Sequence, residues 1–439
     1  MADARETAVR ALMAVDRGAW SDLTLAASIR KAGLDARDAA LCTAICAGVL
    51  QNRALLDYQI AAYSSLRLNK ISPFVLNVLR AAACQILFLD RVPDSAAVNT
   101  AVAMIRRSAN PKAAGFANAV LRRISEHADD WKLPDVQDRT NYLSVRYSHP
   151  AWLVEYLEKR LGPEAEEALA ANNVAPPVTA RVNTLKTDRE EAMQALTAEG
   201  VEVRDHPFLQ DALILAHSGS IEALSAFRTG MIAIQDAASQ LDVLALDPQP
   251  GEQLLDMCAA PGGKTFAAAA RMQNRGGITA CDIYEQRLGL IQRDALRLGA
   301  EIVTAALSDG TVPNPAFAGR FDRVLVDAPC SGMGVIRRKP EIRYKSPEEI
   351  AGLPAVQNEI LKNAASALKK GGIMVYSTCS VMEDENESVI RNFLAQQEDF
   401  TAVPFTLPGG IQAPEGMLTL WPHRNGTDGF FISKLMKRN

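Results

Sequence analysis

Residues 254–265 read LLDMCAAPGGKT, and they indicate the architecture of the C-terminal part of the chain. The apolar start predicts a buried strand, and the small residues after Cys258 predict a loop that leads into a helix. Small residues let backbone N–H groups approach a ligand, and a helix N-terminus favours negative charge. A nucleotide P-loop needs glycine six residues before Lys264, where Cys258 stands, so the spacing excludes that kind of phosphate site.

Apolar runs of strand length recur after this stretch and alternate with helical patterns. The predicted strands lie at 254–256, 278–281, 302–307, 324–326 and 373–376, and the predicted helices at 266–272, 285–298, 355–368 and 386–396. Strands that alternate with helices are typical of a parallel, doubly wound sheet. We therefore predict a C-terminal α/β Rossmann-like domain over residues 236–439.

The sequence before this domain divides into two more predicted domains. The first domain covers residues 1–139: the pattern is helical from about Arg5 to Glu126, and a polar linker follows at 127–139. The stretch SPFVLNVLRAAACQILFL at 72–89 repeats apolar residues at three- and four-residue spacing. This spacing predicts an all-α bundle. Residues 140–235 mix predicted helices with short strands and indicate a small α+β domain. The fold class is therefore multidomain.

Basic residues are concentrated in the predicted helical bundle. Between residues 63 and 123, nine lysines and arginines stand against two aspartates, although the whole chain has a formal net charge of −4. A local basic surface on an acidic protein indicates a polyanion partner. Solvated helix faces are the alternative explanation.

Composition excludes several classes of protein. The 439 residues are 48% apolar and 22% charged, which is typical of globular proteins and excludes collagen, coiled-coil rods and wholesale disorder. Seven scattered cysteines without a CxxC pair form no disulfide framework, and five scattered histidines indicate no metal site. Apolar runs fall short of the ~20 residues of a membrane span, and the N-terminal residues lack a secretory signal. We expect a cytoplasmic monomer that binds no membrane.

Acidic residues follow successive predicted strands. Asp282 stands nineteen residues after Gly263, at the end of the second strand, and Asp309 follows the third. An acid in the place of Asp282 can accept hydrogen bonds from ribose hydroxyls, and Asp309 can contact an adenine edge. Because the GxGxxG pattern is absent, a nucleoside cofactor without a pyrophosphate, S-adenosylmethionine, fits better than a dinucleotide. Taken singly, each acid is better explained as a strand-end or cap residue, and their recurrence favours a binding site.

Two cysteines stand directly after predicted strands, at the same edge of the predicted sheet. Cys330 lies in DAPCSGMG (327–334), and Cys379 lies in YSTCS (376–380). Carbon 5 of a pyrimidine is too weak a nucleophile to take a methyl group from a sulfonium, but a thiolate added to carbon 6 makes it enamine-like. One cysteine attacks and a second can assist release, and the residues alone leave open which does which. A free thiol with a pKa of ~8.5 is mostly protonated at neutral pH, so Lys264 or a helix N-terminus is expected to lower it.

Three motifs resemble the RNA cytosine-5 methyltransferase family. In order, they are DMCAAPGGKT (256–265), DAPCSGMGVIRRKPEIRY (327–344) and YSTCSVMEDENE (376–387). The helical domain, with VPDSAAVNTAV (92–102) and GFANAVLRR (115–123), is similar to the NusB-type RNA-binding fold. The combination is similar to bacterial members of the family that act on 16S rRNA.

The resemblance implies S-adenosylmethionine-dependent methylation of carbon 5 of a cytosine in 16S rRNA. In the family the nucleophile is the cysteine of the second cysteine motif, here Cys379, and Cys330 helps to release the methylated RNA. The implied cofactor site comprises Cys258, Ala259, Ala260, Pro261, Gly262, Gly263 and Lys264, with Asp282, Asp309 and Asp327 as further cofactor or substrate contacts. The alternatives are a non-catalytic RNA-binding factor for ribosome assembly and a methyltransferase for another RNA, such as tRNA.

A second group of basic residues follows the first cysteine motif. It comprises Arg337, Arg338, Lys339 and Arg343. These side chains either hold substrate phosphates or belong to a solvated loop. Aromatic residues amount to 6%, which favours recognition of RNA by shape and backbone contacts over extended base stacking.

Overall fold

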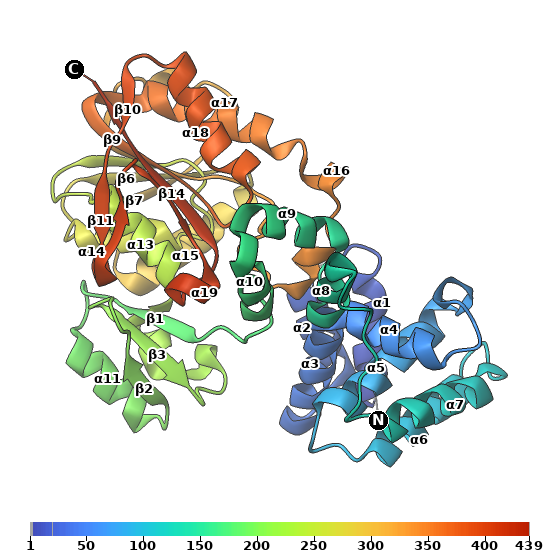
Figure 1. Ribbon diagram of the computed structural model, residues 1–439. Coiled ribbons are helices and arrows are strands. Elements are labelled where there is room, and N and C mark those ends of the chain that lie inside the picture. The colour runs from blue at the N-terminus through green and yellow to red at the C-terminus, as the bar shows by residue number, and fades with distance from the viewer. Residues whose placement is uncertain (1–2, 20, 439) are drawn as a thin grey trace. The chain divides into compact units, whose positions relative to one another are not determined.

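The computed structural model describes residues 3–19 and 21–438, and the chain divides into two compact units (Figure 1). The first unit runs to Val174 and also includes the short segment Ile336–Lys345. The second unit comprises the rest of the chain from Ala175 onward. Ten residues from the sequence that follows Cys330 therefore belong to the first unit.

The first unit is all-α, which confirms the predicted class of the N-terminal domain. Its helices are α1 (Ala4–Val15), α2 (Ser21–Ala32), α3 (Ala36–Gln51), α4 (Arg53–Tyr63), α5 (Pro73–Phe88), α6 (Asp94–Arg106), α7 (Ala113–Glu126), α8 (Arg139–Tyr147), α9 (Ala151–Leu161) and α10 (Ala165–Ala171), with the 3-10 turns η1 (Leu68–Lys70), η2 (Gly162–Glu164) and η5 (Pro340–Tyr344). Asp3 and Asp35 accept backbone hydrogen bonds at the N-terminal ends of α1 and α3. Helix α5 begins at Pro73, whose fixed φ suits a first helical turn.

The core of the first unit consists of apolar helix faces. Val75, Leu79 and Ala82 of α5 are at most 2% exposed and pack with residues of α1, α3, α6 and α7. Their three- and four-residue spacing is the pattern from which the helix was predicted. Among the described residues no single helix is long and apolar enough to cross a membrane, although the bent pair of α3 and α4 passes that test by length and composition.

The second unit begins with a small antiparallel sheet in the order β2-β3-β1-β4. The elements here are β1 (Val178–Val182), α11 (Arg189–Ala198), β2 (Glu202–Asp205), β3 (Ala212–Ala216), η3 (Ile221–Ala223), α12 (Ser225–Arg228) and β4 (Ile232–Ile234). Ala180, Leu213 and Ile232 of the sheet pack with Leu196 of α11. This part has the α+β fold predicted for the middle of the chain, but its sheet begins at Val178, and residues 140–174 of the predicted range 140–235 belong to the all-α first unit.

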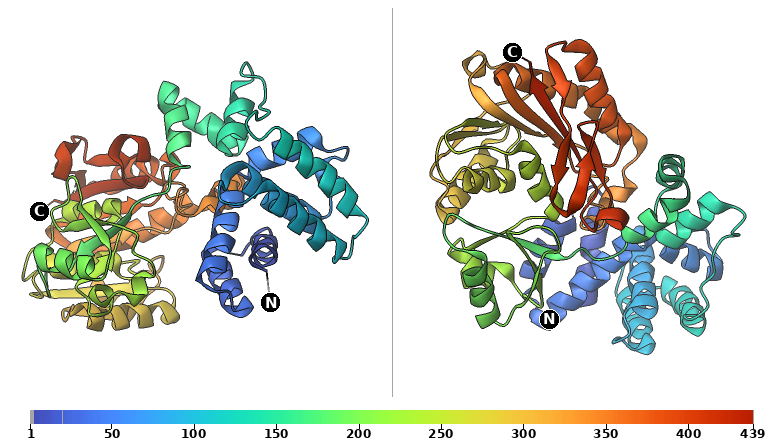
Figure 2. Two further views of the ribbon diagram at one scale, coloured as in Figure 1. Left: turned by 90° about the horizontal axis from the view of Figure 1, so that it is seen from below. Right: turned by 60° about the vertical axis from the view of Figure 1, so that its left-hand side comes forward.

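The large sheet of the second unit has the order β10-β14-β9-β8-β5-β6-β7, with β13 paired to β14. Its C-terminal strands, at the red end of the colour range, are seen from two further sides in Figure 2. Its strands are β5 (Gln253–Asp256), β6 (Gly277–Asp282), β7 (Val303–Leu307), β8 (Phe321–Asp327), β9 (Leu368–Thr378), β10 (Phe400–Ala402), β13 (Met417–Leu420) and β14 (Phe430–Lys437). The strands from β5 to β9 run parallel, as predicted, whereas β14 runs antiparallel to β9. The antiparallel edge was not predicted, because residues 400–437 contain no alternation of strand and helix.

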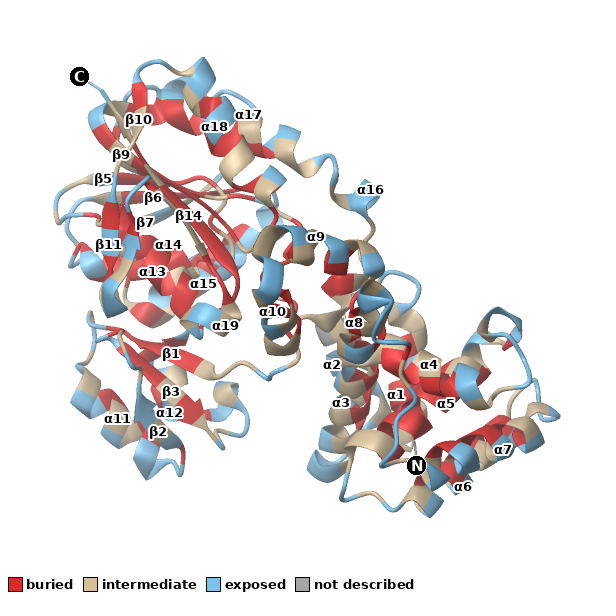
Figure 3. Ribbon diagram, viewed as in Figure 1, coloured by how far each residue is buried: buried red, intermediate tan, exposed pale blue. Residues whose placement is uncertain are grey.

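Helices cover both faces of the large sheet. Helices α13 (Ala237–Leu246), α14 (Gly263–Arg271) and α15 (Glu285–Leu298) pack on the face that carries Leu254, and α17 (Leu353–Ala367) and α18 (Glu387–Gln396) pack on the face that carries Leu255. Both leucines are fully buried, as expected for a central parallel strand. Figure 3 shows the strands of this sheet largely in the colour of buried residues. Shorter elements complete the unit: η4 (Pro315–Phe317), α16 (Pro347–Ile350), η6 (Glu383–Glu385), β11 (Phe405–Leu407), η7 (Pro408–Gly410), β12 (Ile411–Ala413) and α19 (Pro422–Asn425).

The strand order reverses at β5. The chain passes from β5 to β6 and β7 on one side, and then returns to β8 and β9 on the other. In sheets of this kind, ligands bind beyond the carboxyl ends of the strands at such a reversal. All the motifs that carry candidate functional residues follow the carboxyl ends of these strands.

Candidate active site

The loop between β5 and α14 carries the first motif. Within it, the Ala259 N–H donates to the Cys281 carbonyl oxygen at 2.7 Å, and the Gly262 N–H donates to the Ala259 carbonyl oxygen at 2.7 Å. Gly262 has a φ of +107°, and a Cβ there would lie 2.5 Å from the Phe266 ring, so only glycine fits. No described side chain caps the N-terminus of α14, which leaves its first N–H groups for a ligand.

The two acids predicted to contact a nucleoside follow β6 and β7. Asp282 is buried at the end of β6, and its Oδ1 accepts a hydrogen bond from the Tyr284 N–H at 2.9 Å. Asp309 is half-buried, and its Oδ1 accepts bonds from the N–H and the hydroxyl of Thr311 at 2.9 and 2.7 Å. These local bonds fix both carboxylates at the edge where the loop after β5 also lies.

Lys264 lies in a buried cluster of charges. Its ammonium forms an ion pair with Asp327 and lies 3.7 Å from Oδ2 of Asp242, which also accepts a hydrogen bond from the Ser377 hydroxyl at 2.8 Å. Burial lowers the pKa of Lys264, but the two carboxylates outweigh burial and leave that pKa above its ordinary value. Burial raises the pKa of Asp242 to about 7, against the effect of Lys264.

Asp256 is a third buried acid of this region. Burial raises its pKa to about 7, and the hydrogen bond that it accepts from the Thr265 hydroxyl at 2.6 Å opposes this shift. The bond ties the end of β5 to α14.

Among residues 3–19 and 21–438, no three His, Cys, Asp or Glu side chains gather in an arrangement that could hold a metal ion.

The two cysteines of the second and third motifs meet at this edge. The sulfur atoms of Cys330 and Cys379 lie 3.2 Å apart, although the residues follow different strands. The Gly334 N–H donates to the Cys379 carbonyl oxygen at 2.9 Å, which joins the loop of one cysteine to the other. A Cβ at Gly334 would collide with the Gly429 carbonyl group, so this approach of loops requires glycine.

The two thiols differ in acidity. The hydrogen bond with Cys330 lowers the pKa of Cys379, and Lys264 acts in the same direction, whereas burial opposes both. The same hydrogen bond and burial place the pKa of Cys330 well above its ordinary value. A shared proton on Cys330 therefore favours a thiolate at Cys379, which is the more nucleophilic form.

Three buried acids of the site were not predicted from the sequence: Asp242, Asp256 and Glu385. Asp256 begins the first motif, but no role was assigned to it. Asp242 lies in a predicted helix with the sequence AASQLDVLAL, where a lone acid among apolar residues was the available signal. Glu385 lies within YSTCSVMEDENE, but it is one of four acids in that motif. Spacing alone does not separate a buried carboxylate from exposed neighbours.

Arg343 corrects an expectation from sequence. It was expected to hold substrate phosphates or to lie in a solvated loop, but it is fully buried in the first unit. Its Nη1 donates to the carbonyl oxygens of Gln51 and Ser148 at 3.0 and 3.2 Å, and to Oδ1 of Asn173 at 2.9 Å. These partners are distant in sequence, so a short basic run does not reveal them. Of the other basic residues in this run, Arg338 is exposed, whereas Arg337 and Lys339 are half-buried.

Comparison with protein families identifies three matching segments. Residues 243–436 match the family described as 16S rRNA methyltransferase RsmB/F. Residues 2–126 match the NusB family, and residues 149–222 match the ferredoxin-like domain of RsmF/B-like methyltransferases. The matches follow the order of the all-α, small α+β and large-sheet parts.

Relatives of known family match over almost the whole chain. The probable ribosomal RNA small subunit methyltransferase B of Bacillus subtilis is 37% identical over 99% of this chain and 98% of its own length. The ribosomal RNA small subunit methyltransferase B of Pectobacterium carotovorum is 36% identical over 91% of each chain.

Two solved structures share the fold of this chain. The crystal structure of PH0851 superposes with a TM-score of 0.83 at 30% identity, and covers 99% of this chain and 98% of its own. A methyltransferase homologue from Pyrococcus horikoshii superposes with a TM-score of 0.58 at 32% identity, over 68% of this chain and 99% of its own. On these grounds, and on the three motifs at the edge of the sheet, the chain belongs to the 16S rRNA methyltransferase RsmB/F family.

Proposed function

We propose that this chain transfers a methyl group from S-adenosylmethionine to carbon 5 of a cytosine in 16S rRNA, through a covalent adduct with Cys379. The observation that carries the proposal is the pair of thiols, whose sulfur atoms lie 3.2 Å apart and differ in acidity. Relatives named ribosomal RNA small subunit methyltransferase B support the choice of RNA.

S-adenosylmethionine fits the residues at the carboxyl edge of the sheet. When bound, it supplies a methyl group on a sulfonium. The loop that would hold it consists of Cys258, Ala259, Ala260, Pro261, Gly262, Gly263 and Lys264. Asp282 would accept hydrogen bonds from the ribose hydroxyls, and Asp309 would contact the adenine edge. The uncapped N-terminus of α14 and the glycine conformation of the loop support this role.

In the proposed reaction, the Cys379 thiolate forms a bond from Sγ to carbon 6 of the cytosine, which moves electron density to carbon 5. Carbon 5 takes the methyl group from the sulfonium, which leaves as a neutral thioether. Carbon 5 then loses its proton to a base, and the bond between carbon 6 and sulfur breaks, which returns its electron pair to Cys379 as a thiolate. Cys330 would assist this elimination, because its sulfur lies beside the sulfur that leaves. Lys264 and Asp327 line the same edge, and the positive charge of Lys264 favours the Cys379 thiolate.

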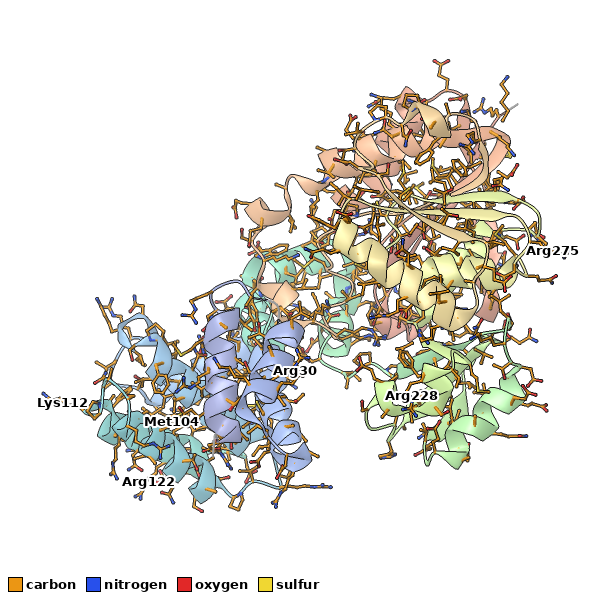
Figure 4. The ribbon with its side chains drawn as sticks, turned by 180° about the vertical axis from the view of Figure 1, so that it is seen from behind. Arg30, Met104, Lys112, Arg122, Arg228 and Arg275 are labelled. Carbon is orange, nitrogen blue, oxygen red and sulfur yellow. The ribbon has the colours of Figure 1, made fainter. Side chains whose placement is uncertain are left out.

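We propose that the three parts of the chain have different roles in RNA binding and methyl transfer. Residues 1–139 would bind RNA, residues 140–235 would contribute further RNA recognition, and residues 236–439 would carry out methyl transfer. Exposed cations of the first unit support RNA binding there, among them Arg30, Lys112 and Arg122 (Figure 4). The target cytosine must be unpaired or extruded to reach the thiols.

Bisulfite mapping of total RNA from cells with and without the gene tests the proposed reaction. The account expects a 5-methylcytosine in 16S rRNA that disappears without the gene and returns with the wild-type chain. Loss of a 5-methylcytosine from tRNA instead would assign another RNA substrate. An unchanged map, with altered ribosome assembly, would favour a non-catalytic assembly factor.

The RNA-binding role of the first unit is tested separately by charge reversal. Lys112→Glu combined with Arg122→Glu is expected to weaken rRNA binding and to flatten its salt dependence, because phosphate contacts release counterions. Each lost contact is expected to reduce the slope of log K against log salt by about 0.7 to 0.9. An unchanged slope would show that these side chains belong to a solvated face.

A further inference from the structure

The contact between the two thiols is repeated by the residues that follow them. Ser331 follows Cys330 and Ser380 follows Cys379, and both serines are fully buried. Their hydroxyl oxygens lie 3.0 Å apart. Two loops from different strands are therefore joined at two consecutive positions, first by the sulfur atoms and then by the hydroxyl groups.

Glu385, the last residue of η6, accepts hydrogen bonds from both serines. Its Oε2 accepts from the Ser331 hydroxyl at 2.6 Å and from the Ser380 hydroxyl. Its Oε1 accepts from the Ser331 N–H at 2.7 Å and from Nε2 of Gln357 in α17 at 3.3 Å. One carboxylate thus connects the two cysteine loops with each other and with a helix.

Glu385 is itself held in place. It is only 2% exposed, and its carbonyl oxygen accepts a hydrogen bond from the Tyr376 hydroxyl at 2.6 Å. Gln357 donates a second bond, at 3.0 Å, to the carbonyl oxygen of Pro329, the residue before Cys330. Residues on both sides of Cys330 are therefore bonded to one network, in which the buried carboxylate has several donors.

The charge of Glu385 does not explain its presence. Burial, Asp327 and Glu385 all oppose the lowering of the Cys379 pKa by the Cys330 hydrogen bond. A residue placed there to activate the nucleophile would have the opposite sign of charge. In contrast, the hydrogen bonds of Glu385 reach both cysteine loops, so its contribution is to the position of these loops.

We propose that Glu385 is a positioning residue that, through Ser331 and Ser380, holds the sulfur atoms of Cys330 and Cys379 together. The inference rests on the proposed function for its kinetic consequence, because a covalent adduct requires Cys379 to attack while Cys330 stays beside it. Its structural consequence, the closeness of the thiols, is measurable without any RNA.

Phenylarsine oxide measures the closeness of the thiols directly. The reagent forms two As–S bonds with a close pair of thiols and releases water, whereas a single thiol holds it weakly. The wild-type chain is expected to bind it tightly at this pair, and Cys330→Ala is expected to lose that binding and so identify the site. Glu385→Ala is expected to bind it at least about tenfold more weakly, although both thiols remain.

Glu385→Gln keeps a side chain of the same shape whose amide can still join the two serine hydroxyls. It is expected to restore most of the tight binding of the arsenical, which separates position from charge. Glu383→Gln is the matched control, because Glu383 lies in the same 3-10 turn and pairs with Arg391 at 3.0 Å. It is expected to behave as the wild type.

The kinetic consequence is measured as the rate of adduct formation with RNA that contains 5-fluorocytosine. Glu385→Ala is expected to slow the adduct-forming step by about 10²-fold, since displacements of about 1 Å have that effect, with little change in the RNA concentration at half-maximal rate. Wild-type affinity for the arsenical in Glu385→Ala would overturn the positioning role. Absence of any adduct in the wild type would instead overturn the proposed function, and leave the arsenical result to judge Glu385.

Discussion

Lys264 and Arg343 are both buried cations, but they lie in opposite environments. Lys264, in the second unit, faces the carboxylates of Asp327 and Asp242, and its pKa is above the ordinary value. Arg343, in the first unit, donates mainly to neutral carbonyl oxygens, and burial lowers its pKa to about 10. Lys264 therefore belongs to a cluster of ionisable groups. Arg343 is surrounded mainly by carbonyl oxygens, which do not titrate.

This difference distinguishes a residue that affects the reacting groups from a residue that stabilises the fold. A lysine among carboxylates next to the thiols can influence the charge of a reacting group, since the positive charge of Lys264 lowers the pKa of Cys379. An arginine surrounded by carbonyl oxygens fixes the backbone segments that supply them, here the ends of α3 and α8 and the turn after α10. Substitution of each cation distinguishes these two roles.

Lys264→Met is expected to produce the largest effect. It leaves the buried Asp242 without its cation, and removal of one partner of a buried pair costs at most about 3–5 kcal/mol of unfolding free energy, a cost that Asp242 reduces by taking up a proton. Adduct formation is expected to fall as well, because Cys379 loses a nearby positive charge. Amide hydrogen exchange of the second unit and an adduct gel measure the two effects. Wild-type protection and adduct yield together would contradict the role of Lys264.

Arg343→Met is expected to lower the stability of the first unit while leaving the cofactor site intact. Buried carbonyl oxygens that lose their donor cost about 1–3 kcal/mol of unfolding free energy. Hydrogen exchange is expected to rise in α3 and α8, and the affinity for S-adenosylhomocysteine, measured by calorimetry, is expected to stay unchanged. A lower affinity with unchanged exchange would show that Arg343 acts on the site instead.

Asp242→Asn is expected to change the pH dependence of stability. The pKa of Asp242 is raised from 3.8 to about 7 by burial, so the folded chain holds this proton more tightly than the unfolded chain. Unfolding free energy is therefore lost as pH rises from about 4 to about 7, by at most about 1.4 kcal/mol per pH unit for one proton. Asp256 shifts in the same direction, so the variant is expected to remove about half of the combined slope. Urea unfolding at several pH values measures it, and an unchanged slope would mean that Asp242 stays ionised when folded.

Much of the fold follows from local patterns. Apolar spacing predicted α5, and the alternation of strands and helices predicted β5 to β9 in a parallel sheet. The same reasoning placed Cys330 and Cys379 at one edge, because the carboxyl ends of parallel strands meet there. The antiparallel strand β14 lay outside this reasoning, since it needs no helical crossover.

The contacts between distant residues could not be predicted in this way. The approach of the two sulfur atoms to 3.2 Å depends on loops that start from different strands. The role of Glu385 depends on Ser331, 54 residues away, and that of Arg343 depends on Gln51, 292 residues away. A pattern of residue types within one segment does not predict contacts with residues of distant segments.

One denaturing gel shows whether Cys379 attacks the base and Cys330 assists its release. Cys330→Ala and Cys379→Ser are each incubated with S-adenosylmethionine and unmodified 16S rRNA, and covalent complexes are separated from free protein. The account predicts a slow-migrating RNA–protein band for Cys330→Ala, in which attack and methyl transfer occur but elimination is slow, and none for Cys379→Ser. The reverse pattern, a trapped complex in Cys379→Ser and none in Cys330→Ala, would show that Cys330 is the nucleophile and would contradict the account.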